Sequence, residues 1–167
     1  MKKILLYSIL LLPLTVQCQN SLNTTPKWVN NPPKSKDKIY AVGVGTSSSP
    51  DVAERKAIMD ANVNLAENVR PAVVTITSHI DSIIQGNEIL IERVNIIRKK
   101  VEATLQNTQL INKTVLEEKG KYKVYVLVEM PKKEINRSVI SYVDEDKELY
   151  NAIAKTKTYK RIAREAK

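Results

Sequence analysis

The 167-residue chain contains a single cysteine and a single histidine, and these two shortages exclude several kinds of chemistry. Cys18 has no second cysteine with which to form an intramolecular disulfide, so the fold depends on packing. A serine or cysteine hydrolase needs a base beside its nucleophile, and His79 is the only histidine for that role. A zinc site of histidines and cysteines would need further ligands. We therefore expect no catalytic residues, no metal and no other cofactor.

Aromatic residues are also scarce: they make up 5% of the chain, with one tryptophan and no phenylalanine. Isoleucine, valine and leucine are plentiful, which favours an aliphatic core in which a sheet is covered by helices. The formal net charge of +9 attracts anionic partners such as lipid head groups, cell-wall polymers or nucleic acid. The basic residues do not alternate with aromatics in the manner of RNA-binding proteins, so we expect no nucleic acid.

Residues 1–18 have the parts of a secretory signal peptide: two lysines, an apolar run from Ile4 to Leu14, and a short polar segment. The run is too short for a permanent membrane span. The chain is therefore predicted to be exported, either to the outer membrane or to the periplasm. Cys18 is a candidate for lipidation by the bacterial lipoprotein pathway. The alternative is ordinary cleavage that releases Gln19 as the N-terminus, because Gln17 fits poorly before a lipidated cysteine.

Residues 19–38 are rich in Asn, Thr, Ser, Pro and Lys and are predicted to form an extended linker. Trp28 within it is interpreted as a hydrophobic latch onto the domain, with a ligand-stacking residue as the alternative. Residues 39–167 then form a single domain.

The domain is predicted to begin with a buried strand, a tight connection and a helix. The strand runs from Ile39 to Gly45. Ser48 or Ser49 is suited to the N-cap of the helix, and Pro50 to its first position. Small residues then recur every four positions and share one helical face, which allows a sheet to approach closely. This face consists of Ala53, Ala57, Ala61 and Leu65.

Pro71 is predicted to end this helix, and the β-branched residues 73–80 to form a second strand that contains His79. Gly86 and Asn87 mark a turn. Residues 88–105 have apolar residues at helical spacing, although a strand over 88–100 is the alternative.

Residues 109–116 and 122–129 flank a charged turn with Gly120 and are predicted to form a hairpin. The second of these strands is apolar on both faces, so we expect it at the centre of the sheet.

Residues 132–167 are predicted to form one long helix or two in series. If continuous, this helix would extend about 54 Å, so its last turns would project beyond the domain. The projecting part is basic. It is interpreted either as a solvated, frayed helical face or as a surface that docks on a partner protein, a second copy or an anionic surface. Its basic residues are Lys155, Lys157, Lys160, Arg161, Arg164 and Lys167.

The segment before the alanine-rich helix is the one candidate ligand site. Gly43, Gly45, Ser48 and Ser49 precede a helix N-terminus, where backbone N–H groups attract anions. The third glycine of a dinucleotide site is missing, and so is the Gly-Lys-Ser/Thr of a phosphate loop. Small residues that let the strand turn into the helix are the structural interpretation. A binding protein or enzyme for anionic or phosphorylated ligands at residues 45–49 is the functional alternative.

Several short motifs together resemble one family. They are Pro26-x-Trp28-Val29, Tyr40-Ala41-Val42-Gly43-x-Gly45, the alanine-rich face, and Gly120-x-Tyr122-x-Val124-Tyr125-Val126-Leu127-Val128. The combination resembles the twenty-kilodalton outer-membrane lipoprotein family, which is related to the N-terminal domain of the flagellar assembly protein T. The resemblance implies a small α+β domain in which an antiparallel sheet packs on the alanine helix, an envelope location and no known enzymatic activity. Gln17 departs from the family's usual lipid-attachment box.

The sequence thus predicts an α+β fold: an antiparallel sheet of three to four strands on an alanine-striped helix, followed by a long C-terminal helix. The leading functional hypothesis is an exported, non-enzymatic envelope protein that binds or scaffolds other envelope components.

Overall fold

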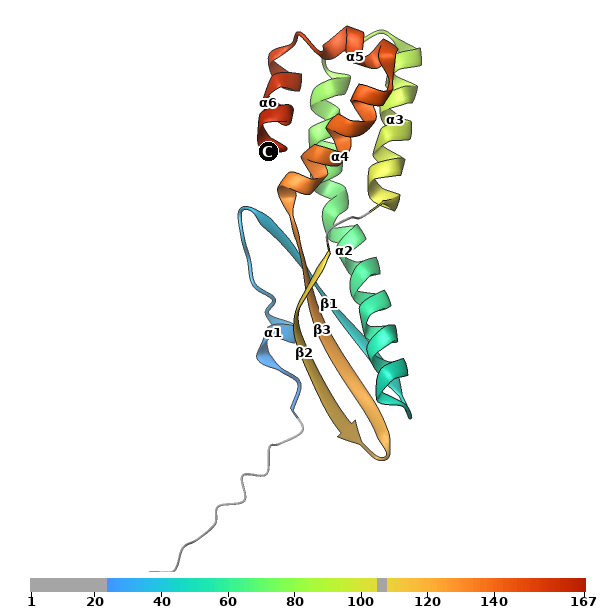
Figure 1. Ribbon diagram of the computed structural model, residues 1–167, viewed down its shortest axis with the longest axis vertical. Coiled ribbons are helices and arrows are strands. Elements are labelled where there is room, and N and C mark those ends of the chain that lie inside the picture. The colour runs from blue at the N-terminus through green and yellow to red at the C-terminus, as the bar shows by residue number, and fades with distance from the viewer. Residues whose placement is uncertain (1–23, 105–107) are drawn as a thin grey trace, which may run out of the picture.

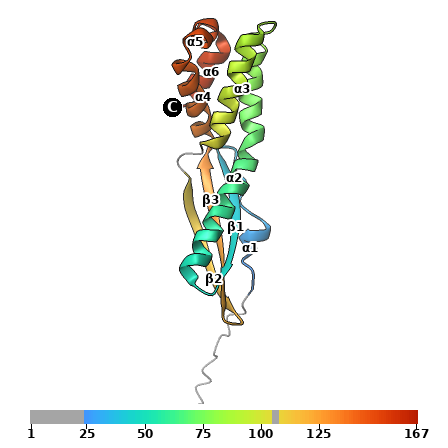
Figure 2. The ribbon, with the colours of Figure 1, turned by 90° about the vertical axis from the view of Figure 1, so that its right-hand side faces the viewer.

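The computed structural model describes residues 24–104 and 108–167 and shows an elongated α+β molecule with two halves (Figures 1 and 2). A three-stranded sheet occupies one end, helices gather at the other, and α2 runs through both. The predicted fold class is confirmed. The elements are α1 (Lys27–Asn30), β1 (Lys38–Ser47), α2 (Pro50–Asp81), α3 (Glu88–Ala103), β2 (Gln109–Glu118), β3 (Lys121–Pro131), α4 (Lys132–Glu145), α5 (Lys147–Ile153) and α6 (Lys157–Glu165).

The sheet is antiparallel and has the order β1-β3-β2, so β3 is central as predicted. The predicted hairpin of β2 and β3 turns at Lys119 and Gly120, which both have positive φ. One face of β3 packs on α2 through Val124, Val126 and Val128, all buried. The register between β2 and β3 shifts at Ile111, where β2 carries a bulge.

Two glycines allow β1 to lie directly against α2. A Cβ atom on Gly43 would stand 2.0 Å from the carbonyl oxygen of Ala57, and one on Gly45 would stand 2.0 Å from that of Ala53. No side chain fits at either position. The small residues of the strand and of the helix together bring the two backbones into contact.

Polar side chains of α2 also bond the outer edge of β1. The four α2 residues are spaced by four, and the β1 residues that they bond are spaced by two. These spacings match because both correspond to a rise of about 6–7 Å. The bonds are Lys56 Nζ to Thr46 O (3.4 Å), Val44 N to Asp60 Oδ2 (2.8 Å), Asn64 Nδ2 to Val42 O (2.8 Å) and Asn68 Nδ2 to Tyr40 O (2.9 Å).

Helix α2 continues through Pro71 to Asp81, so the predicted helix end and the predicted strand over residues 73–80 are both wrong. The series of buried residues at every fourth position does not stop at Leu65, and Val69, Val73 and Thr77 extend it at full burial. Burial of this face outweighs the missing N–H of Pro71 and the strand preference of the β-branched residues that follow. His79 is exposed in the last turn.

The start of α2 lies where the sequence predicts, with Ser49 at the N-cap and Pro50 in the first turn, but the Ser49 side chain makes no capping bond. The region after the Gly86 turn is helical, as α3, which rules out the strand alternative for residues 88–100. Its N-cap is Asn87, whose side chain accepts a hydrogen bond from the backbone N–H of Leu90 at 3.1 Å.

The C-terminal segment forms three shorter helices instead of one long helix, and its last part does not project. Extended backbone at Asp146 ends α4, and α5 ends at Ile153. Asp146 and Thr156, both with extended backbone, cap the helices that follow them through their side chains. Helix α6 turns back to pack against α4 and α2, and Ile162 becomes 2% exposed (Figure 1). Burial of this apolar side favours the return over an isolated projecting helix.

The segment before β1 lies on the sheet face opposite α2 (Figures 1 and 2). Helix α1, which contains the half-buried Trp28, contacts β3. Thr25 Oγ1 and Tyr125 Oη are hydrogen-bonded at 3.1 Å, and Tyr125 and Leu127 on this face are each 3% exposed. The described part of residues 19–38 thus covers the second face of the sheet, as the latch interpretation of Trp28 expects.

Candidate functional site

Packing against α2 explains why part of the predicted anion site, residues 43–49, consists of small residues. Gly43 and Gly45 are buried against α2 and are small because a side chain would meet the helix backbone. Ser48 is exposed, and the hydroxyl of Ser47 accepts a hydrogen bond from the backbone N–H of Ser49 at 3.3 Å. Packing against α2 therefore accounts for both glycines without a ligand, and an anion site at Gly43 and Gly45 is not tested by this contact. Anion binding by Ser48 and Ser49 stays a prediction.

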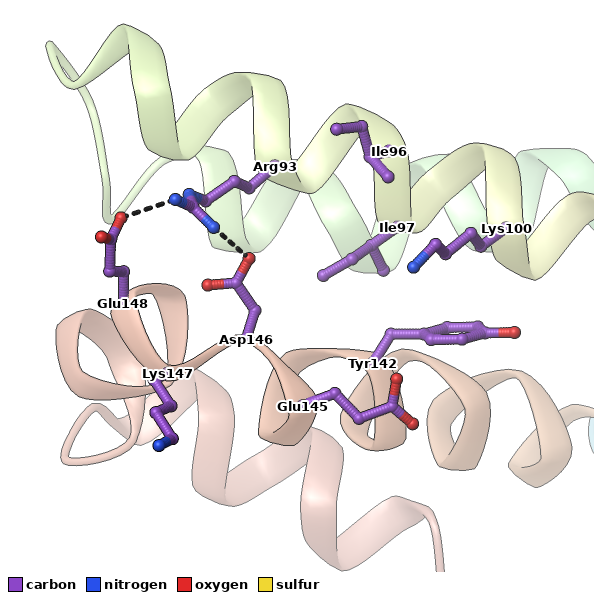
Figure 3. A pocket seen from close by; sticks show the side chains of 9 residues that line it. All are labelled: Arg93, Ile96, Ile97, Lys100, Tyr142, Glu145, Asp146, Lys147 and Glu148. Atoms are coloured by element: carbon purple, nitrogen blue, oxygen red, sulfur yellow. Dashed lines mark hydrogen bonds and ion pairs between the residues drawn. The ribbon is translucent and has the colours of Figure 1, made fainter.

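A groove of about 470 Å³ lies between α3 and the junction of α4 with α5 (Figure 3). Arg93 reaches across it and pairs with Asp146 at 2.9 Å and with Glu148 at 2.8 Å. Further along the groove, the ammonium of Lys100 stands 5.3 Å from the centre of the Tyr142 ring. These contacts join α3 to the C-terminal helices.

The charges in this groove stabilise one another. Burial alone would raise the pKa of Asp146, but the hydrogen bonds from Arg93 and from the backbone of Leu149 lower the pKa below its usual value. The hydrogen bond to Asp146 likewise raises the pKa of Arg93. A carboxylate held ionised in this way is a poor general acid or base near neutral pH. We interpret the groove as a clamp between helices.

Six basic residues lie in α6 and in the residues beside it. All six basic residues of the predicted tail are exposed, and none of them makes an ion pair within the part of the chain that the structure describes. We call this set the α6 basic face. It consists of Lys155, Lys157, Lys160, Arg161, Arg164 and Lys167.

The opposite side of α6 holds the helix in place. Tyr159 Oη donates a hydrogen bond to Asp144 Oδ1 at 2.5 Å, and its ring meets that of Tyr150 edge to face at 5.7 Å. Burial, followed by the bond to Asp144, raises the pKa of Tyr159. Near its end, the carbonyl of Ala166 accepts a bond from Arg137 Nη2 at 3.2 Å. The basic face is therefore presented on a fixed helix.

A second groove, of about 640 Å³, adjoins the end of α6. It is lined by Lys36, Lys38, Lys132 and Lys133, together with Asp37 and Glu165. Lys38 is bonded to Glu129 at 2.6 Å, which raises the pKa of the lysine. Sequence reasoning missed this groove because residues 36–38 and 132–133 lie far apart in the chain and meet only where β1 begins and β3 ends.

Three further features concern lipidation at Cys18, metal binding and membrane-spanning helices. Cys18 lies outside the described residues. Within the described ranges, no group of three or more histidine, cysteine, aspartate or glutamate residues is placed to hold a metal ion. In the same ranges, none of the helices combines the length and the apolar character that crossing a membrane requires.

Comparisons with known proteins give one clear result. A family model described as LPP20 lipoprotein matches residues 26–130, from α1 through β3, and leaves α4–α6 outside the match. A search of curated proteins finds no match. A crystal structure described as that of the secreted protein HP1454 from the human pathogen Helicobacter pylori is similar at 20% identity and a TM-score of 0.30. The match covers 76% of this chain and 52% of that one, so this chain spans about half of that protein.

Proposed function

This chain belongs to the LPP20 lipoprotein family, and from that premise we propose that it is a non-enzymatic cell-envelope protein that binds an anionic envelope polymer through the α6 basic face. As a member of a lipoprotein family, the chain is an exported envelope protein. The binding partner and the absence of enzymatic activity are the parts that we propose.

The unpaired charge of α6 is the observation that carries the proposal. A solvated helix usually intersperses acids among its bases, whereas α6 and the residues beside it set six exposed cations against the single carboxylate of Glu165. Each cation near an anionic surface contributes roughly 1 kcal/mol at moderate salt. Several acting together are enough for salt-dependent binding without a shaped pocket.

The position of α6 favours a polymer over the membrane surface. We propose that Cys18 carries a lipid, which leaves at most about 21 Å of chain between the anchor and Thr24. Residues 24–38 lie beside the sheet, whereas α6 lies in the helical half (Figure 1). Helix α2 alone is about 48 Å long, so the tether keeps the sheet half near the membrane and directs α6 toward the aqueous space.

The anchor is tested by the mass of the mature N-terminus in membrane and soluble fractions. A diacylglyceryl-modified Cys18 supports the tether. A start at a free Gln19 or a pyroglutamate overturns it and makes the protein periplasmic and soluble. This measurement is independent of the binding assay.

Binding is tested by co-sedimentation of the purified protein with isolated cell-wall polymer at rising salt. The variant Lys160→Glu/Arg164→Glu reverses two charges on α6, and Lys99→Glu/Lys121→Glu reverses two exposed charges elsewhere with the same net change. We expect the α6 variant to lose binding at least about tenfold and the control to change little. Equal losses would mean that only net charge matters. Binding to anionic lipid vesicles in place of polymer would also contradict the proposal.

A ligand site at Ser48 and Ser49 is the second candidate, motivated by their place at the start of α2. A thermal-shift screen with nucleotides and sugar phosphates tests it. Specific stabilisation that disappears in Ser48→Ala/Ser49→Ala would favour this candidate over the α6 proposal.

A further inference from the structure

The two outer edges of the sheet differ in how their backbone groups are bonded. Four α2 side chains bond the backbone of β1 from Tyr40 to Thr46, so that edge is closed to another strand. Among the described residues, no comparable series of side chains lies along the outer edge of β2. Edge strands with free N–H and C=O groups are templates for pairing with another chain.

Strand β2 also exposes apolar side chains that no described element covers fully. Leu110, Ile111 and Val115 are 46%, 43% and 46% exposed. The bulge at Ile111 interrupts the regular ladder, so the stretch suited to pairing is residues 112–118. This stretch is short, apolar at Val115 and Leu116, and charged on either side of them.

We propose that β2 pairs with β2 of a second copy of this chain, antiparallel and about a twofold axis at Val115, which joins two three-stranded sheets into one. In this register Lys113 lies opposite Glu117 of the other copy, and the symmetry repeats the pair on the other side of the axis. Thr114 lies opposite Leu116, and Val115 opposite itself. Opposite charges in directly opposed positions stabilise such pairing.

Neighbouring registers lack this charge complementarity. A shift that places the axis at Thr114 sets Ile111 opposite Glu117, and one that places the axis at Leu116 sets Val115 opposite Glu117. An axis at Glu117 places two glutamates against each other, which is repulsive. The charges of β2 therefore select both the partner, a second copy, and the register.

The shape of the molecule permits this arrangement. The helical half lies beyond the end of the sheet where β2 begins, and the β2–β3 hairpin lies at the other end (Figure 1). Antiparallel pairing of β2 therefore places the two helical halves at opposite ends of the joined sheet, away from each other. Lys113 is bonded to Glu54 of its own α2 at 2.9 Å. Its ammonium is therefore held on the same face of the sheet as the Glu117 side chain.

Cysteine cross-linking tests the register. Cys18 is replaced by serine in every variant, so that the introduced cysteine is the only thiol. This replacement also removes the proposed lipid anchor, so the cross-linking is done on purified protein in solution. In Val115→Cys the two Cα atoms would lie about 4.5–5.5 Å apart, within disulfide range. Ile111→Cys is the matched control, because it is equally exposed and on the same strand. Its two copies would be separated by about 27 Å along the joined strands.

We expect at least about tenfold more cross-linked dimer from Val115→Cys than from Ile111→Cys under mild oxidation. Equal yields would mean non-specific contact, and no dimer from Val115→Cys would mean that the edge does not pair with itself. Cross-linking of Val115→Cys to a different protein in an added envelope extract, in place of the dimer, would identify another occupant. Each of these three results overturns the proposal.

Charge reversal distinguishes an effect on strand pairing from an effect on folding stability. Lys113→Glu, added to Val115→Cys, places glutamates opposite each other and should lower the dimer yield about tenfold. Adding Glu117→Lys should restore the yield. Both variants contain Lys113→Glu and therefore both set a second carboxylate against Glu54, so any loss of folding stability from that contact remains. A yield that follows the melting temperature, with no recovery in the double reversal, would reject the self-pairing.

Discussion

The two halves of α2 pack in opposite ways, although the same four-residue spacing defines both. Near its start, Ala53, Ala57 and Ala61 bring the helix backbone against β1. Beyond Leu65 the buried positions are Val69, Val73, Thr77 and Ile80, larger side chains that pack among the other helices. Each four-residue step advances about 40° beyond a full turn, so the buried face rotates around the helix from the sheet toward the bundle.

The difference indicates which kind of substitution should destabilise each half of α2. The sheet half depends on the absence of side-chain atoms, so an added methyl group should be harmful there. The helical half depends on large side chains that fill space, so a removed group should be harmful there.

The largest effect is expected from Gly43→Ala. The new Cβ would lie 2.0 Å from Ala57 O and 2.3 Å from Ala61 N, which forces the helix and the strand apart. We expect a loss of about 4 kcal/mol in the free energy of unfolding, measured by urea denaturation. Gly86→Ala is the control: nothing lies within 4 Å of its Cβ, and its positive φ alone should cost about 1 kcal/mol. Equal losses would show that close packing does not decide stability here.

The next effect tests the helical half. Ile162→Ala should lower the free energy of unfolding by about 2–3 kcal/mol, because Ile162 is 2% exposed and packs in the common core. Lys160→Ala on the same helix removes only an exposed side chain and should change stability by less than about 0.5 kcal/mol. If both variants melt like the parent protein, α6 is not part of the core, and the expectation of an independent tail is restored.

A smaller effect is expected at the closed edge of β1. Asp60→Ala removes the acceptor of the Val44 N–H, which is bonded at 2.8 Å. We expect a loss of about 1 kcal/mol and faster hydrogen exchange of the Val44 amide. Asp60→Asn keeps an acceptor oxygen and should retain most of the protection. Unchanged exchange in Asp60→Ala would mean that α2 does not protect this edge.

The smallest effect concerns the clamp at Asp146. Its pKa is lowered in the folded state, so its contribution is present above the unfolded pKa of about 3.9 and is lost as pH falls through the folded pKa. Asp146→Asn keeps an N-cap oxygen for Leu149 but removes the charge. We expect a loss of less than about 1 kcal/mol at neutral pH and a flatter pH dependence below about pH 4. Glu148→Gln, at a more exposed position, should leave that dependence unchanged.

Local signals predicted many elements correctly. The Ser49-Pro50 start of α2, the Gly86 turn, α3 and the β2–β3 hairpin all follow from spacing and turn residues close together in the chain. The end of α2 differs from the prediction because the buried series continues across Pro71 and outweighs the local signals of the proline and of the β-branched residues after it. That series was visible in the sequence.

The candidate binding surface was predicted only in part. The six basic residues of the tail are evident in the sequence, but they do not project, because extended backbone at Asp146 and Thr156 interrupts the helix. The groove beside Lys36 and Lys132 has no local signal, because β1 pairing with β3 is what brings these lysines together.

The sequence by itself determined most of the helix and strand types, the central place of β3 and the positive charge of the last residues, because each depends on periodicity or composition within one segment. Only the tertiary structure decided that α2 continues past Pro71, that α6 folds back, and that side chains of α2 close the edge of β1. These outcomes depend on the burial of faces contributed by distant segments. The free energy of that burial exceeds the local preferences that a short stretch of sequence expresses.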